Sequence, residues 1–175
     1  MPLDKNTARK SGLAARAKLS ESERKEKDAR IRDQVIGKIR DIDVIGCYVS
    51  MKDETDTHAI IQWCFDHRKT VCVPRVEGDT LVFHRISSFD DLAEGTFHVM
   101  EPVIDDPVDP EQIGFMIVPL SAFDESNNRT GYGRGYYDSI LKRCAHKAGI
   151  GYAEQKCKEI QCDPWDIKLD EVIYA

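Results

Sequence analysis

The chain has 175 residues, of which 41% are hydrophobic and 32% are charged, and its formal net charge is −6 at pH 7. This length and composition are typical of one globular domain, and the acidic balance argues against nucleic acid as the main partner. No apolar run is long enough to cross a membrane and the N-terminus lacks the pattern of a signal peptide, so we expect no membrane contact and a cytoplasmic location.

Residues 1–40 predict two basic helices. They contain twelve Lys or Arg and six Asp or Glu, whereas the remaining chain contains 13 and 25. Alanine and basic residues favour a helix over residues 3–19. Ser20 followed by Glu23 is a capping-box pattern, which predicts that a second helix begins here and ends near Ile39.

Lys5 and Arg9 lie four residues apart in the first expected helix, so their side chains share one face. Two cations on one face suit an oligophosphate ligand. The alternative is an ordinary basic face that is solvated or attracted to the acidic body of the protein.

Beyond residue 40, short apolar runs alternate with helical patterns. The expected strands are 44–50, 70–74, 81–86, 115–119, 149–153 and 171–174, and the expected helices are 57–68 and 135–147. The segments 89–110 and 120–134 are expected to be mostly irregular.

This alternation predicts the α/β class: a single three-layer domain, residues 1–175, with a largely parallel central sheet flanked by helices. The basic helices of residues 1–40 are expected to pack on this body. Ligands of such sheets bind beyond the carboxyl ends of the strands. The loops 51–57 and 120–134 and the segment after Ala153 are therefore expected to line one crevice.

The most informative stretch is 129–138, Arg-Thr-Gly-Tyr-Gly-Arg-Gly-Tyr-Tyr-Asp. Its three glycines let backbone N–H groups approach an anion closely beside a helix N-terminus. Arg129 and Arg134 add donors that match phosphate, and Asp138 adds an oxygen that suits Mg²⁺. The stretch predicts a nucleotide-phosphate cradle, with a flexible turn as the alternative; it is neither a P-loop nor a G-x-G-x-x-G fingerprint.

Two further acidic residues are candidates for ligand contact. Glu54 follows an expected strand, where its carboxylate can accept hydrogen bonds from ligand N–H groups. The alternative is that it caps the following helix, since Asp56 and Thr57 are nearby. Asp166 lies in an exposed turn; it is either a partner of Asp138 in holding Mg²⁺ or an ordinary surface acid. No G-x-S-x-G or H-E-x-x-H pattern occurs, which favours phosphoryl-transfer chemistry.

Several motifs occur together in a fixed order along nearly the whole chain. They are Lys5-x-x-x-Arg9, Tyr48-Val-Ser-Met-Lys-Asp-Glu54-x-Asp-Thr, Val73-Pro74-Arg75, Val118-Pro119 through Ala122-Phe123-Asp124, Arg129-x-Gly-Tyr-Gly-Arg-Gly-Tyr-Tyr-Asp138, Gly151-Tyr-Ala-Glu-Gln155 and Asp166-x-x-x-Asp170-Glu-Val-Ile. With these motifs the chain resembles the 5-formyltetrahydrofolate cyclo-ligase (5,10-methenyltetrahydrofolate synthetase) family.

The resemblance implies an ATP-dependent enzyme that converts 5-formyltetrahydrofolate to 5,10-methenyltetrahydrofolate and releases ADP and phosphate, with Mg²⁺ as cofactor. In the family mechanism ATP phosphorylates the formyl oxygen, and the second folate nitrogen then closes the ring as phosphate leaves. The expected partners are these two substrates alone, in a monomer or weak homodimer.

The resemblance also assigns roles to positions. Arg134 and Tyr136 are the catalytic candidates, and Asp138 and Asp166 are the metal ligands. The folate contacts are Val49, Glu54 and Phe97, together with Tyr132, Gly133, Arg134, Gly135 and Tyr136, which face both ligands. The ATP contacts are Lys5, Arg9, Arg129, Thr130, Gly131, Tyr132, Gly133, Arg134, Gly135, Tyr136 and Tyr137.

Three positions depart from the family pattern: Leu120 and Asn128 replace glycines, and Thr130 replaces a leucine. The departures put backbone conformation and substrate fit in question. Two alternatives therefore stay open: a non-catalytic folate or nucleotide-binding module, and a related ATP-dependent enzyme whose substrate has drifted.

Overall fold

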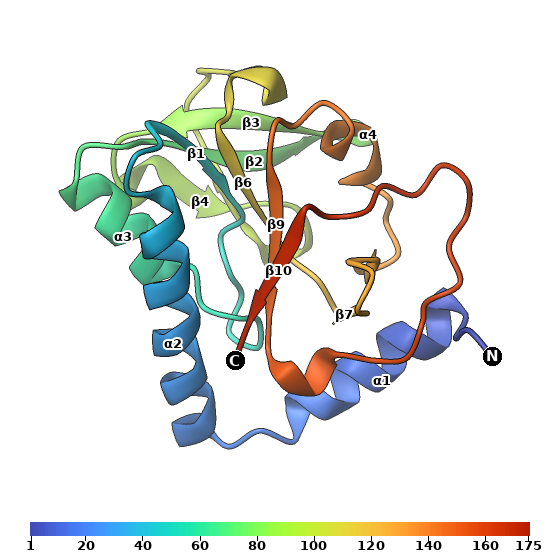
Figure 1. Cartoon of the computed structure of the whole chain (residues 1–175). Helices are drawn as coiled ribbons and strands as arrows, with labels where there is room; N and C mark the ends of the chain where they lie inside the picture. The colour runs from blue at the N-terminus through green and yellow to red at the C-terminus, as the bar shows by residue number, and fades with distance from the viewer.

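The computed structural model describes residues 1–175 and is organised around a six-stranded sheet in the order β10-β9-β6-β1-β2-β3 (Figure 1). All neighbouring strands are parallel except β2 and β3, which are antiparallel. This confirms the predicted, largely parallel sheet. The strands are β1 Val44–Cys47, β2 Thr70–Glu77, β3 Thr80–Ile86, β6 Phe115–Val118, β9 Lys147–Gly151 and β10 Glu171–Tyr174.

Helices cover both faces of the sheet, as the three-layer prediction requires. The α-helices are α1 Lys5–Ala17, α2 Glu21–Ile39, α3 His58–Asp66 and α4 Asp138–Leu141. Side chains alternate across a strand, so Phe115 and Ile117 of β6 pack with α2 and α3, whereas Met116 and Val118 pack with α4. Short 3₁₀ turns cover Phe89–Asp91, Thr96–His98, Pro110–Gln112 and Ala153–Gln155.

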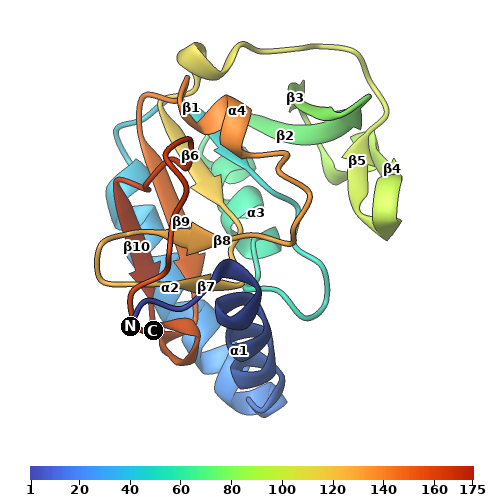
Figure 2. The ribbon, with the colours of Figure 1, turned by 90° about the vertical axis from the view of Figure 1, so that its right-hand side faces the viewer.

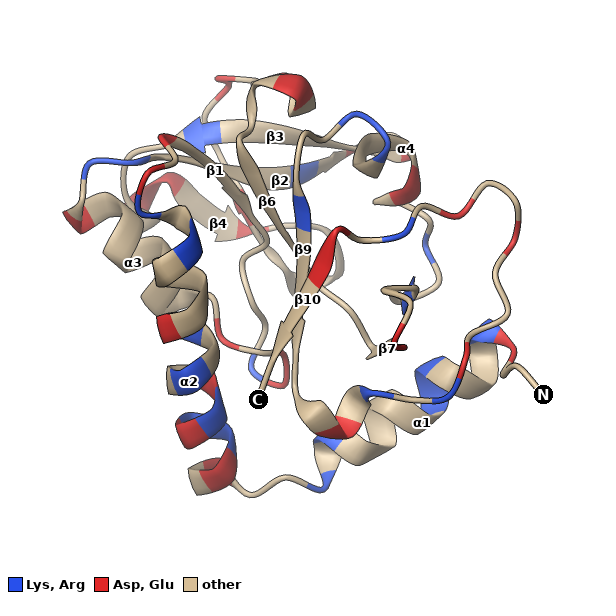
Figure 3. Ribbon diagram, viewed as in Figure 1, with Lys and Arg blue, Asp and Glu red and all other residues tan.

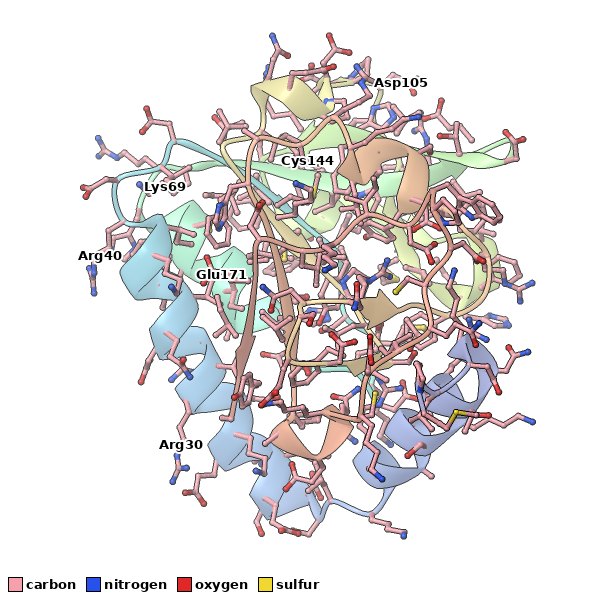
Figure 4. The ribbon with its side chains drawn as sticks, turned by 45° about the vertical axis from the view of Figure 1, so that its right-hand side comes forward. Arg30, Arg40, Lys69, Asp105, Cys144 and Glu171 are labelled. Carbon is pink, nitrogen blue, oxygen red and sulfur yellow. The ribbon has the colours of Figure 1, made fainter.

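Helix α2 begins where the capping box was predicted. The Ser20 Oγ accepts a hydrogen bond from the Glu23 N–H at 3.1 Å, and the Glu23 carboxylate accepts from the Ser20 N–H at 2.9 Å. The outer face of α2 carries charges of both signs (Figure 3), and its Arg30 and Arg40 side chains project away from the protein (Figure 4). No helix of the protein is both long and apolar enough to span a bilayer.

Helix α1 lies apart from these layers and packs on the segment that follows β6 (Figure 2). Asp4 caps it by accepting a hydrogen bond from the Thr7 N–H at 2.8 Å. The approach is close at Gly12, where a Cβ atom would lie 1.9 Å from the backbone oxygen of Ser121. Glycine at this position lets the helix backbone touch the segment directly.

The predicted helix over 135–147 is wrong in extent, because α4 ends at Leu141. The chain turns back after this helix so that β9 can pair with β6, beginning at Lys147 opposite Met116. Ile140, Leu141 and Cys144 are buried against the sheet, and their spacing produced the helical pattern in the sequence.

Two hairpins occur in segments that were expected to be irregular. They pair β4 (Leu92–Glu94) with β5 (Met100–Pro102), and β7 (Ala122–Phe123) with β8 (Arg129–Thr130). Their strands of two or three residues are too short to show an alternating pattern. Buried carboxylates stabilise both hairpins by accepting hydrogen bonds from backbone N–H groups. Glu101 accepts from the Val76 N–H at 2.9 Å, and Asp124 accepts from the Asn128 N–H at 3.0 Å.

Candidate active site

A cavity of about 630 Å³ opens beyond the carboxyl ends of β1 and β6, between α1, the β4–β5 hairpin and the loop after β8. Every residue that the sequence singled out as a site residue lines it. These residues are Lys5, Arg9, Val49, Glu54, Phe97, Arg129, Thr130, Gly131, Tyr132, Gly133, Arg134, Gly135, Tyr136, Tyr137, Asp138 and Asp166. The expected crevice therefore exists, and segments distant in sequence build it.

Residues 129–137, hereafter the glycine ribbon, form one wall of the cavity. Gly133 and Gly135 have φ angles of 84° and 71°, in the left-handed region that residues other than glycine rarely adopt. The first turn of the ribbon is tied down by Ser121, whose buried Oγ donates to the Gly131 carbonyl oxygen at 2.7 Å. The ribbon can therefore present backbone N–H groups to an anion from a fixed base.

The cations of α1 lie against this ribbon. The Arg9 Nε donates to the Gly131 carbonyl oxygen at 3.0 Å, and its guanidinium lies beside Gly133. The Lys5 ammonium instead bonds two carboxylates, with Nζ 2.8 Å from Asp163 and 2.5 Å from Asp166. Both cations face the cavity, as their spacing predicted, but they do not share a partner.

The two acids predicted to hold a metal line the same end of the cavity, beside the Arg129 guanidinium. Withdrawal from water lowers the pKa of Arg129, and the nearby carboxylate of Asp138 opposes this shift. The Arg129 Nε donates to the Pro119 carbonyl oxygen at 3.1 Å. The Asp166 carboxylate forms an ion pair with the Lys5 ammonium through one of its oxygens. This donor set can accept a divalent cation that brings phosphate oxygens with it.

Glu54 faces the cavity with both oxygens held. The Met51 N–H donates to its Oε1 at 2.9 Å, and the Tyr132 hydroxyl donates to its Oε2 at 3.1 Å. Burial raises the pKa of Glu54, while these donors oppose the shift. The capping alternative belongs to Asp56 instead, whose carboxylate accepts from the first N–H groups of α3 at 3.2 and 3.3 Å.

The opposite wall carries apolar surface. Val49, directly beyond β1, is 2% exposed, and Phe97 lies at the tip of the β4–β5 hairpin with φ 57°. The Arg134 guanidinium lies 4.1 Å from the centre of the Phe97 ring, in a cation–π contact that joins the hairpin to the glycine ribbon. Apolar surface and the carboxylate oxygens of Glu54 therefore line the same cavity.

Comparison with known proteins shows the family to which this fold belongs. The model of the 5-formyltetrahydrofolate cyclo-ligase family matches residues 3–175. The chain belongs to this family. The cyclo-ligase of Mycoplasma pneumoniae is 30% identical over 98% of both chains, and that of Mus musculus is 30% identical over 74% of this chain and 72% of its own. The solution structure of the 5,10-methenyltetrahydrofolate synthetase from Aquifex aeolicus superposes with a TM-score of 0.81 at 33% identity, covering 97% of this chain and 89% of that one.

The departures from the cyclo-ligase pattern have local explanations. The Leu120 side chain is buried and lies over Gly149 and Gly151 of β9, where added Cβ atoms would stand 2.8 and 2.7 Å from its methyl carbons. It requires no positive φ, and the left-handed residue in the following turn is Asn127 rather than Asn128. The Thr130 hydroxyl turns inward and hydrogen-bonds the Ser121 Oγ at 2.7 Å. None of these residues blocks the cavity.

Sequence reasoning missed Arg16, Ser121 and Glu101, all of which are buried. Arg16 lies two helical turns after Arg9 and was detectable by extending the Lys5–Arg9 face. Ser121 and Glu101 carry no local pattern, because each bonds a backbone group that a sequence pattern does not place beside it, Gly131 and Val76 respectively.

Proposed function

We propose that this cavity catalyses the Mg·ATP-dependent cyclisation of 5-formyltetrahydrofolate to 5,10-methenyltetrahydrofolate, with release of ADP and phosphate. The observation that carries the proposal is the joining of two unlike walls in one cavity. One wall has the cations and bare N–H groups that suit a triphosphate. The other has the apolar surface and the carboxylate that suit a pterin, and Tyr132 touches both.

The glycine ribbon, Lys5 and Arg9 hold the phosphates, and Glu54 accepts the pterin N–H groups between Val49 and Phe97. Held in this way, the formyl oxygen attacks the γ-phosphorus and the bond from that phosphorus to the ADP oxygen breaks. The second folate nitrogen then attacks the formyl carbon and loses its proton to solvent. The carbon–oxygen bond breaks and phosphate leaves. Alignment of the two substrates supplies much of the rate enhancement.

Arg134 and Tyr136 are the proposed catalytic residues. The Arg134 guanidinium lies over the Phe97 ring, where the glycine ribbon meets the β4–β5 hairpin. A planar guanidinium there can neutralise charge on the transferring phosphoryl group. Asp138 and Asp166 would hold the metal. Mg²⁺ bound there would withdraw electron density from the phosphoryl group. It would also compete with Lys5 for the Asp166 carboxylate, which would leave the ammonium available to phosphate.

We further propose that one copy of the chain suffices, as a monomer or weak homodimer. The residues proposed to bind both substrates line one cavity of a single chain, which supports this proposal.

The test is ADP release with and without 5-formyltetrahydrofolate, in the presence of Mg²⁺, combined with growth of the methenyl absorbance. We expect both signals only when all three components are present. Folate binding without turnover would indicate a binding module. ADP release that another substrate elicits in place of this folate would indicate drifted specificity.

A further inference from the structure

Arg16 is a buried cation in the cavity wall with no strong ionic partner. It is 5% exposed. Its only carboxylate contact is with Asp53 at 3.4 Å, and that acid is 71% exposed and belongs to a surface loop. Burial of a charge is unfavourable unless close partners compensate for lost hydration. The main partner of Arg16 is instead the Tyr132 hydroxyl, to which its Nη1 donates at 2.9 Å.

The direction of these hydrogen bonds can be assigned from the chemistry of the three groups. A guanidinium can only donate, so the Tyr132 oxygen accepts from Arg16. The single hydroxyl proton is then free to point elsewhere, and the Glu54 Oε2 lies 3.1 Å away. The relay therefore runs from Arg16 through Tyr132 to a Glu54 oxygen that accepts.

We propose that Arg16 is a positioning residue: it directs the Tyr132 proton onto Glu54 and so holds that carboxylate ionised and aimed at the N–H donors of the folate. The proposal rests on the function proposed above. With Oε1 held by the Met51 N–H and Oε2 by Tyr132, the remaining lone pairs of Glu54 are available to a ligand. Arg16 thus acts on the folate through two other residues.

The charges around Glu54 give the proposal a pH signature. Burial raises the pKa of Glu54, and Arg16 is the nearby side-chain cation that opposes this shift. Loss of Arg16 should raise that pKa further. As the pH is lowered, the variant should therefore lose folate binding at a higher pH than wild type does. The other polar or charged groups that face Glu54 are Asp53 of its own loop, Arg24 of α2 at its carbonyl oxygen, Tyr48 beyond β1, and Tyr132 and Tyr137 of the ribbon.

The test is a double-mutant cycle in which calorimetry measures the binding of 5-formyltetrahydrofolate without ATP. Arg16→Met, Glu54→Gln and the double variant are compared with wild type, and Lys10→Met serves as the control because Lys10 is an exposed cation of the same helix. We expect Arg16→Met to raise the folate Kd by about tenfold, the effect of losing a hydrogen bond to a charged group. Lys10→Met should leave that Kd unchanged.

The double variant decides the mechanism. If Arg16 acts through Glu54, adding Arg16→Met to Glu54→Gln should change the Kd by less than about twofold, because coupled residues do not contribute additively. The acid limb of folate binding should also lie at higher pH in Arg16→Met than in wild type. The proposal would be overturned if the two substitutions had additive effects on the folate Kd, or if the acid limb of folate binding did not shift. It would also be overturned if Arg16→Met weakened nucleotide binding as much as folate binding.

A second variant guards against misfolding. Tyr132→Phe removes only the relaying hydroxyl, and it should show the same non-additivity with Glu54→Gln even if Arg16→Met does not fold. Additivity in that pair would also overturn the proposal. Wild-type ADP release reports separately on the proposed function, so failure of the relay and failure of the function are distinguishable.

Discussion

Replacing Gly12 by alanine should destabilise the protein, although alanine is the better helix former. The new Cβ would lie 1.9 Å from the Ser121 backbone oxygen and 2.9 Å from its carbonyl carbon. Normal contact needs about 3.5 Å, so α1 must retreat by roughly 1.5 Å. Overpacking of this size costs about 3 kcal/mol, and the gain in helix propensity offsets about 1 kcal/mol of it. The net loss is about 2 kcal/mol.

Gly37→Ala is the matched control, since Gly37 also lies within a helix but a Cβ there meets nothing within 4 Å. It should stabilise the protein by up to about 1 kcal/mol. In a chain of this size, Gly12→Ala should lower Tm by about 4–8 °C and Gly37→Ala should raise it by about 2–4 °C. Thermal unfolding followed by circular dichroism measures both changes.

The same retreat should weaken ATP binding, because Arg9 moves away from the Gly131 carbonyl oxygen together with α1. We expect a higher ATP KM in Gly12→Ala and an unchanged one in Gly37→Ala. If Gly12→Ala proves as stable as wild type, the close packing of α1 on the Ser121 segment is wrong, and so is its role in placing the cations.

Three further outcomes are expected. Leu120→Ala should destabilise the protein by about 2–5 kcal/mol in urea unfolding, because its side chain fills the space over Gly149 and Gly151; a neutral result would contradict this packing. Asp138→Asn should raise the Mg²⁺ concentration needed for half-maximal turnover without altering the circular dichroism spectrum, whereas an unchanged requirement would remove it from the metal site. Glu54→Gln should raise the folate KM more than the ATP KM. Burial raises the pKa of Glu54, so wild-type kcat/KM for folate should fall as the pH drops through that pKa, and Glu54→Gln should lack this limb. Equal effects on both substrates, or a persistent limb, would make Glu54 structural.

The sheet and the two N-terminal helices could be predicted because their signals are local. The Ser20–Glu23 capping box and the fully buried Ile31, Val35 and Ile39 follow from patterns within one helix. The helix predicted over 135–147 was wrong in extent for the opposite reason. Its apolar spacing is real, but the pairing of β9 with β6 turns the chain after Leu141.

The candidate site was predictable where charge and glycine spacing carry the chemistry, and not where a group acts through a distant partner. The residues that resemblance assigned to the site do line one cavity. The sequence cannot show that Ser121 anchors the ribbon at Gly131, or that Tyr132 connects Arg16 to Glu54. Those contacts join segments 10 to 116 residues apart.

The most direct test of the account is a crystal structure with Mg²⁺ and a non-hydrolysable ATP analogue. We predict that the triphosphate lies along the glycine ribbon with Lys5 and Arg9 on its oxygens, and that the metal lies between the phosphates and the carboxylates of Asp138 and Asp166. Nucleotide density away from this ribbon would contradict both the assigned site and the reaction derived from it.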